Sequence, residues 1–144
     1  MALKQLDNLV KIGQLKKELP DQSQFDGMLN SAKQRLKDVE TEGLSDEGRF
    51  TLAYGAAHLL ATAALRWHGY RSGNRYQVFQ CLQHTVGLEN KKWRVLDKCH
   101  KQRNIAEYEG HLEITPQLLQ ELIVITTELL GKVEALGPVD EVSK

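Results

Sequence analysis

Apolar side chains recur along most of the chain at the three- to four-residue spacing of amphipathic helices. The pattern is clearest between residues 24 and 39, after Asp21 or Ser23, either of which can cap a helix, and before Gly43, which ends it. Six residues carry the spacing there: Phe25, Met28, Leu29, Ala32, Leu36 and Val39. The sequence therefore predicts a helix with one buried face in this region.

A second helix is predicted from Asp46 to about His68, with Ser45 as its cap. Two stripes of mostly small apolar residues lie on opposite sides of it: Phe50, Ala53, Tyr54, Ala57, Ala61, Ala64 and His68 on one side, and Leu52, Ala56, Leu59 and Ala63 on the other. A helix that is apolar on two faces has neighbours on both. We therefore expect it to form the centre of the core.

The remaining segments predict shorter or weaker elements. Residues 1–20 indicate an N-terminal helix that is weakened by Gly13, residues 70–74 a basic turn, and residues 75–85 a short helix. Thr115 and Pro116 begin a last helix. The β-branched run 123–127 favours a strand locally, but no partner strand is evident elsewhere in the chain, so we predict a helix.

Together these elements predict an all-α, up-and-down bundle of about five to six helices. The chain is long enough to bury a core as one domain. We place that domain at residues 1–137, with a helical core over 24–135, and expect residues 138–144 to form a flexible tail.

Charge is unevenly distributed although the chain is neutral overall. Residues 66–103 carry nine Lys and Arg against two acidic residues, whereas residues 104–144 carry two against eight. A basic segment of this kind is most often a solvated face, and less often the binding surface for an anionic partner such as RNA.

The chain is expected to be cytoplasmic and to make no use of the membrane. Its longest uncharged run, residues 50–65, is too short to span a bilayer, and charges interrupt any apolar core near the N-terminus. Cys81 and Cys99 fall at apolar helix positions without metal-binding spacing, so we expect two buried free thiols.

Chemically capable groups are densest in a predicted helix that runs from about residue 90 to 108 and exits at Gly110. Arg94, Lys98 and Lys101 form an outer basic stripe on this helix. Arg103 projects almost within the apolar arc, where an isolated charge is costly, so Glu107 one turn later is its expected partner.

Several side chains flank Arg103, and each permits two interpretations. The Arg103–Glu107 pair is either a structural ion pair at a helix or subunit seam or part of a ligand site. His58 is expected in the core, with a lesser chance of facing the Arg103 cluster, whose further members are His100, Asn104 and Tyr108. The five histidines show no metal-ligand spacing and no cofactor fingerprint is present, so neither a metal nor a cofactor is predicted.

The segment Arg103-Asn104-Ile105-Ala106-Glu107-Tyr108, near the end of a long helix in a small bundle, resembles the HEPN superfamily. The preceding helix that ends in Ala-Leu-Arg-Trp-His-Gly-Tyr-Arg (residues 64–71) and the helix 76–85 are also similar. The resemblance implies an up-and-down bundle that forms a homodimer. It also implies a role in RNA processing, in toxin–antitoxin or defence systems, or as the companion of a nucleotidyltransferase.

The RNase motif of that family is Arg, then four to six residues, then His. Arg103 and Asn104 match its start, but the positions for the histidine hold Tyr108, Glu109 and Gly110, and His111 follows one residue late. This departure favours a module that binds nucleotide, RNA or a partner protein such as an antitoxin without cleaving RNA.

Two alternatives stay open. In the first, the chain is a metal-independent endoribonuclease toxin, in which the resemblance gives Arg103 the scissile phosphate and His111 the acid–base role. In the second, it is a structural adaptor whose polar cluster fixes the register of a dimer.

Overall fold

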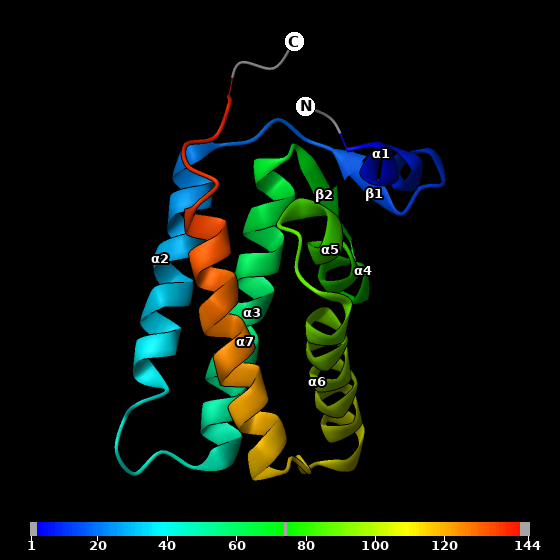
Figure 1. Cartoon of the computed structure of the whole chain (residues 1–144). Helices are drawn as coiled ribbons and strands as arrows, with labels where there is room; N and C mark the ends of the chain where they lie inside the picture. The colour runs from blue at the N-terminus through cyan, green and yellow to red at the C-terminus, as the bar shows by residue number, and fades with distance from the viewer. Residues whose placement is uncertain (1–2, 74, 142–144) are drawn as a thin grey trace.

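The computed structural model describes residues 3–73 and 75–141, and of Arg75 and Tyr76 it describes the backbone alone. Four long helices lie side by side in the bundle, with α3 between its neighbours (Figure 1). In chain order the elements are α1 (Lys4–Lys11), β1 (Leu15–Lys17), α2 (Gln22–Asp38), α3 (Asp46–Trp67), β2 (Tyr70–Ser72), α4 (Arg75–Gln80), α5 (Leu82–Thr85), α6 (Asn90–Glu109) and α7 (Pro116–Glu134). The predicted all-α bundle is therefore confirmed.

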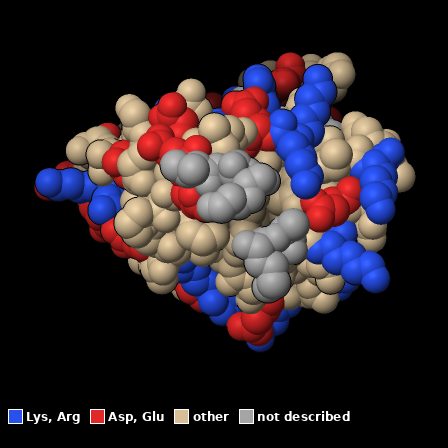
Figure 2. All heavy atoms as spheres, turned by 90° about the horizontal axis from the view of Figure 1, so that it is seen from above, with Lys and Arg blue, Asp and Glu red and all other residues tan. Residues whose placement is uncertain are grey.

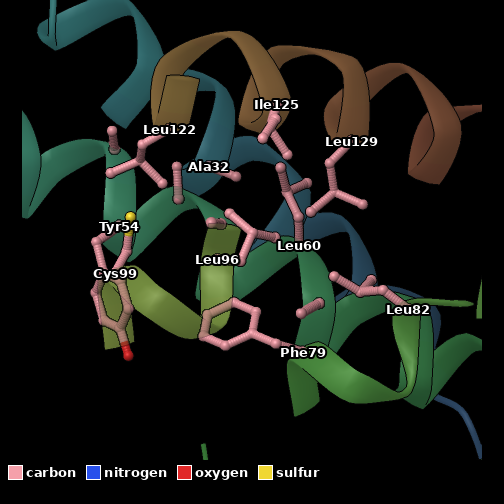
Figure 3. Packing of buried hydrophobic residues seen from close by; sticks show 14 of the residues in the cluster. Ala32, Tyr54, Leu60, Phe79, Leu82, Leu96, Cys99, Leu122, Ile125 and Leu129 are labelled. Carbon is pink, nitrogen blue, oxygen red and sulfur yellow. The ribbon is translucent and has the colours of Figure 1, made fainter. Parts of the chain in front are cut away.

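Helix α3 forms the centre of the core, as its two apolar stripes predict. It begins at Ser45, whose hydroxyl accepts a hydrogen bond from the Gly48 amide at 3.0 Å. Buried alanines bring its backbone close to α2 and α7, which pack against it along most of its length. Figure 3 shows Leu60 of α3 surrounded by Leu96 of α6 and by Ile125 and Leu129 of α7.

The N-terminal segment differs from the single helix predicted for residues 1–20. Helix α1 ends at Lys11, and Gly13 takes a left-handed conformation with φ of 80° that an α-helix cannot continue through. The chain then forms β1, which pairs antiparallel with β2. This two-stranded sheet buries Leu15 with Leu6, Leu65 and Cys81, and that burial outweighs the helical spacing of the sequence.

Of two other predicted helices, the structure interrupts one and confirms the other. The segment 75–85 is interrupted at Cys81, which separates α4 from α5. The β-branched run 123–127 lies inside α7, as predicted, and the Thr115 hydroxyl caps that helix by accepting from the Leu118 amide at 3.0 Å. Tyr70–Ser72, expected in a turn, is strand β2, while Asn74 and the side chain of Tyr76 lie outside the described residues.

The described part of the C-terminal tail is attached to the bundle rather than free. Trp67 donates its indole N–H to the Gly137 carbonyl at 3.0 Å, and the Val139 amide donates to Gln22 Oε1 at 2.9 Å. The Gln22 amide in turn donates to Glu141 Oε2 at 2.8 Å. Residues 138–141, which were expected in a flexible tail, therefore contact the start of α2, and residues 142–144 lie outside the described chain.

Within the described residues, no helix has the length and apolar character needed to cross a membrane.

Candidate functional site

The candidate site lies on α6 near its C-terminal end, where the helix faces the first half of α3. Helix α6 ends at Gly110, which adopts φ of 80° and donates its amide to the Ala106 carbonyl at 2.8 Å. Because the buried residues of α6 are concentrated in its first half, the second half projects polar side chains toward α3 over a less enclosed surface.

Arg103 is held between an aromatic ring and a carboxylate. Its guanidinium carbon lies 5.3 Å from the centre of the Tyr54 ring, and Nη1 lies 3.3 Å from Glu107 Oε1. The arginine side chain is 35% exposed, so solvent reaches it, whereas Tyr54 is buried. The predicted Arg103–Glu107 pair is therefore present, and a cation–π contact fixes the guanidinium at the edge of the core.

His100 is engaged through both nitrogens of its ring. Nδ1 lies 2.9 Å from the Tyr54 hydroxyl oxygen, and Nε2 lies 3.2 Å from the amide nitrogen of Asn104. Which of the two ring nitrogens donates depends on the tautomer, and both have a hydrogen-bond partner. His100 therefore has a fixed orientation, and its hydrogen bonds tie α6 to α3.

Tyr54 of α3 joins the Arg103 cluster, which comprises Tyr54, His100, Arg103, Asn104 and Glu107. The sequence pattern predicted Tyr54 as a core residue and gave no role to its hydroxyl group. His58, one turn later, lies edge-on to Phe79 with ring centres 6.2 Å apart. A tyrosine in an apolar stripe needs a partner for its hydroxyl, and that requirement is the signal that would have found the Tyr54–His100 bond.

Tyr108, predicted as part of the binding site, is 93% exposed. It belongs to the same outer surface of α6 as Ile105, which is 44% exposed. Two large apolar side chains one turn apart are thus left uncovered, and the helical spacing places them in line with the basic stripe of α6 rather than with Arg103.

The basic stripe forms a second surface of α6, on the side away from Arg103. Arg94, Lys98 and Lys101 are all exposed, and Lys101 pairs with the buried Asp97 at 3.2 Å. Arg94 packs over the Trp93 ring at 5.6 Å. The inner cluster and the outer stripe predicted from the sequence are therefore separate surfaces of one helix.

His111 lies beyond the end of α6, and its partners are acidic. Its Nε2 is 3.2 Å from Glu113 Oε1, and this contact, together with the Glu109 backbone, raises the pKa of His111 above its usual value. The rise of a helix puts Gly110 roughly 10 Å along the axis from Arg103. In the described residues, Arg103 and His111 thus each have a separate carboxylate partner, Glu107 and Glu113.

The ligand-capable atoms of Glu109, His111 and Glu113 lie within 4.8 Å of one another. All three side chains are exposed, and exposed acidic groups commonly come this close without binding a metal. We assign no metal to them.

The two cysteines are buried free thiols, as predicted. Burial raises the pKa of Cys99 to about 12 and that of Cys81 to about 11. Because the thiolate is the reactive form, neither residue has the properties of a catalytic nucleophile.

The fold and these contacts define an all-α bundle with an arginine-centred polar cluster at the α3–α6 contact. Comparison of the chain with models of protein families, with proteins of curated function and with solved structures finds no match in any of the three.

Proposed function

We propose that this chain is a HEPN-like module that binds RNA through the Arg103 cluster without cleaving it. The observation that carries the proposal is the placement of Arg103, a partly exposed guanidinium fixed against the Tyr54 ring and neutralised by one exposed carboxylate, that of Glu107. A guanidinium held in this way is suited to a phosphate oxygen, since little side-chain entropy remains to be lost on binding.

The outer basic stripe and the exposed Tyr108 ring lie on the side of α6 away from Arg103, where they offer further contacts to a strand that passes around the helix. Arg94, Lys98 and Lys101 offer charge for the phosphate backbone, and an exposed aromatic ring is a surface on which a base can stack. These features favour a single-stranded RNA over a duplex, because stacking needs an unpaired base.

Two features argue for binding rather than cleavage. Both ring nitrogens of His100 are engaged by Tyr54 and Asn104, and His111 is paired with Glu113 beyond the end of the helix. An acid–base histidine has to reach the ribose hydroxyl next to the phosphate that the arginine holds. The resemblance to HEPN domains also underlies two further parts of the proposal: that two copies pair, and that the chain works in the cytoplasm with an antitoxin or a nucleotidyltransferase.

The test is the binding of a labelled single-stranded RNA at low salt, measured by fluorescence anisotropy. Arg103→Gln is expected to weaken binding by about tenfold, the effect of losing one charged phosphate contact. Glu107→Gln is expected to tighten it, because the competing carboxylate is removed. The matched control is Lys37→Gln, which removes one positive charge at an exposed position of α2. This variant is expected to keep the wild-type affinity.

The same RNA, followed over hours on a gel, separates this proposal from the enzymatic alternative. Intact RNA is expected with the wild-type chain. If the wild-type chain cleaves the RNA and both Arg103→Ala and His111→Ala abolish the cleavage, the chain is an endoribonuclease and the proposal of binding without cleavage is wrong. Absence of wild-type binding at low salt would overturn the RNA proposal altogether.

A further inference from the structure

A cavity of about 270 Å³ lies at the other end of α3, between its last turn, the two-stranded sheet and α4. Arg66 is twelve residues, and so roughly 18 Å, further along α3 than Tyr54, which separates this cavity from the Arg103 cluster. The lining residues are Glu18, Gln24, Thr62, Leu65, Arg66, Tyr70, Arg71, Ser72 and Val78. The wall is therefore partly cationic and hydroxylic, and partly apolar.

Arg66 is the most buried charged group of this wall. Its side chain is only 12% exposed; Nη1 donates to Gln24 Oε1 at 2.8 Å, and Nη2 lies 3.1 Å from Glu18 Oε2. Two buried polar atoms of the lining residues, Arg66 Nε and Thr62 Oγ1, have no hydrogen-bond partner among the described residues. The two arginines of the wall, Arg66 and Arg71, make the cavity suited to an anionic ligand.

Glu18 occupies the position that an anionic ligand would take. Its two carboxylate oxygens reach different arginines, Oε2 to Arg66 at 3.1 Å and Oε1 to Arg71 at 3.2 Å. Glu18 is 38% exposed and Arg71 is 65% exposed, so this bridge lies at the mouth of the cavity and is weak. The oxygens of a phosphate can satisfy the same two guanidinium groups and in addition carry a second negative charge.

The surroundings of the cavity attract anions. Lys16 and Lys17 of β1 are exposed and lie opposite Arg71 and Tyr70 of β2 in the sheet register. Figure 2, which looks onto this end of the bundle, shows Lys and Arg side chains gathered on the right, the side of α1 and β1 in Figure 1. Acidic side chains lie among them, and Lys17 is paired with Asp7 at 3.4 Å, so Lys16 and Arg71 supply most of the positive charge near the mouth.

We propose that this cavity binds a small organic phosphate, whose phosphoryl group displaces Glu18 from Arg66 and Arg71. The apolar part of the wall, from Leu65, Tyr70 and Val78, is available to the organic part of the ligand. The site is independent of the Arg103 cluster and does not depend on the function proposed for it.

The test is a titration of the full chain by two-dimensional amide NMR at constant ionic strength, with adenosine monophosphate and inorganic phosphate as probes. Saturable shifts are expected at Thr62, Arg66 and Ser72, with tighter binding of the monophosphate than of phosphate. Glu18→Gln is expected to tighten binding about fivefold, since it removes the internal competitor, and Arg71→Gln to weaken it by a similar factor.

Lys37→Gln removes the same charge at an exposed position of α2 outside both proposed sites and is expected to leave the titration unchanged. Thr62→Val, which keeps the shape of the side chain, is expected to weaken binding and provides a neutral variant if Glu18→Gln loosens the sheet. Non-saturating shifts, or the same response from wild type, Arg71→Gln and Thr62→Val, would overturn the proposal and leave Glu18 as a structural ion pair.

Discussion

Tyr54 and Glu18 are residues whose roles are set by the groups placed around them. Tyr54 joins the core through its ring and the candidate site through its hydroxyl, which meets His100 at 2.9 Å. Glu18 is an ordinary surface carboxylate in the sequence, yet it bridges two arginines from α3 and β2. The Arg103–Glu107 pair could be predicted because both residues lie on one helix one turn apart. Contacts between elements depend on packing that local spacing does not encode.

At this scale we predict that Tyr54→Phe lowers the free energy of unfolding by about 1 kcal/mol, the usual net value of one hydrogen bond. The ring and its contact with Arg103 are kept, so the loss isolates the hydroxyl. Urea denaturation followed by circular dichroism measures it. Tyr108→Phe removes a hydroxyl from a side chain that is 93% exposed and serves as the control, with no measurable change expected. Equal stability of the Tyr54→Phe chain and the wild type would contradict a stabilising role for this bond.

The pairing of β1 with β2 shows why single elements were harder to predict than the bundle. Three residues per strand give too short a pattern to distinguish from a helix end or a turn, and the partners lie more than fifty residues apart. What holds the sheet is non-local: Leu15 and Tyr70 are buried together, and the Tyr70 hydroxyl donates to Asp7 of α1. The glycine at position 13 was the sequence signal available for the end of α1, because glycine readily adopts the left-handed conformation found there.

The Asp7–Tyr70 contact predicts a pH dependence for this element. The hydrogen bond from Tyr70, aided by Lys17, holds the pKa of Asp7 below its ordinary value, so its contribution to stability is present above about pH 3.8 and is lost as the pH falls through the lowered pKa. Burial and Asp7 raise the pKa of Tyr70 to about 12, so its contribution is complete below about pH 10 and is lost toward pH 12.

Denaturation curves measured across this range test the prediction. Asp7→Asn is expected to abolish the loss of stability that this contact causes at acid pH. Tyr70→Phe is expected to abolish the corresponding loss at alkaline pH. Glu42→Gln removes an exposed carboxylate outside the contact and is expected to keep the wild-type profile. An Asp7→Asn profile that matches the wild type between pH 5 and pH 2 would argue against the assigned role of Asp7.

At the scale of the whole molecule, the class of fold could be predicted because α3 encodes it. Two apolar stripes on one helix require neighbours on both sides, and the structure supplies α2 and α7. Small side chains such as Ala57 and Ala61 let those helices approach closely. The cavity near Arg66 could not be predicted in this way, since its wall is assembled from α2, α3, β2, α4 and Glu18 after β1.

The close packing around α3 predicts that Ala57→Leu destabilises the fold by about 1–3 kcal/mol, because the added volume has no free space at a fully buried position. Ala135→Leu, at the exposed end of α7, adds the same atoms and is expected to change stability by less than about 0.5 kcal/mol. Thermal or urea unfolding distinguishes the two variants. Similar stability of both would mean that α3 has room that the structure does not show.

The anchored C-terminal segment has a consequence for how the molecule can be handled. Val139 and Glu141 are hydrogen-bonded to Gln22 at the start of α2, so the C-terminal segment lies at the end of the bundle where α1 also lies (Figure 1). Helix α6 ends at the opposite end of the bundle. A biotin or affinity handle joined to either terminus therefore orients the molecule on a sensor surface with Arg103 facing the flowing solution. The same attachment places the Arg66 cavity next to the support, so a surface-based assay samples the two proposed sites unequally.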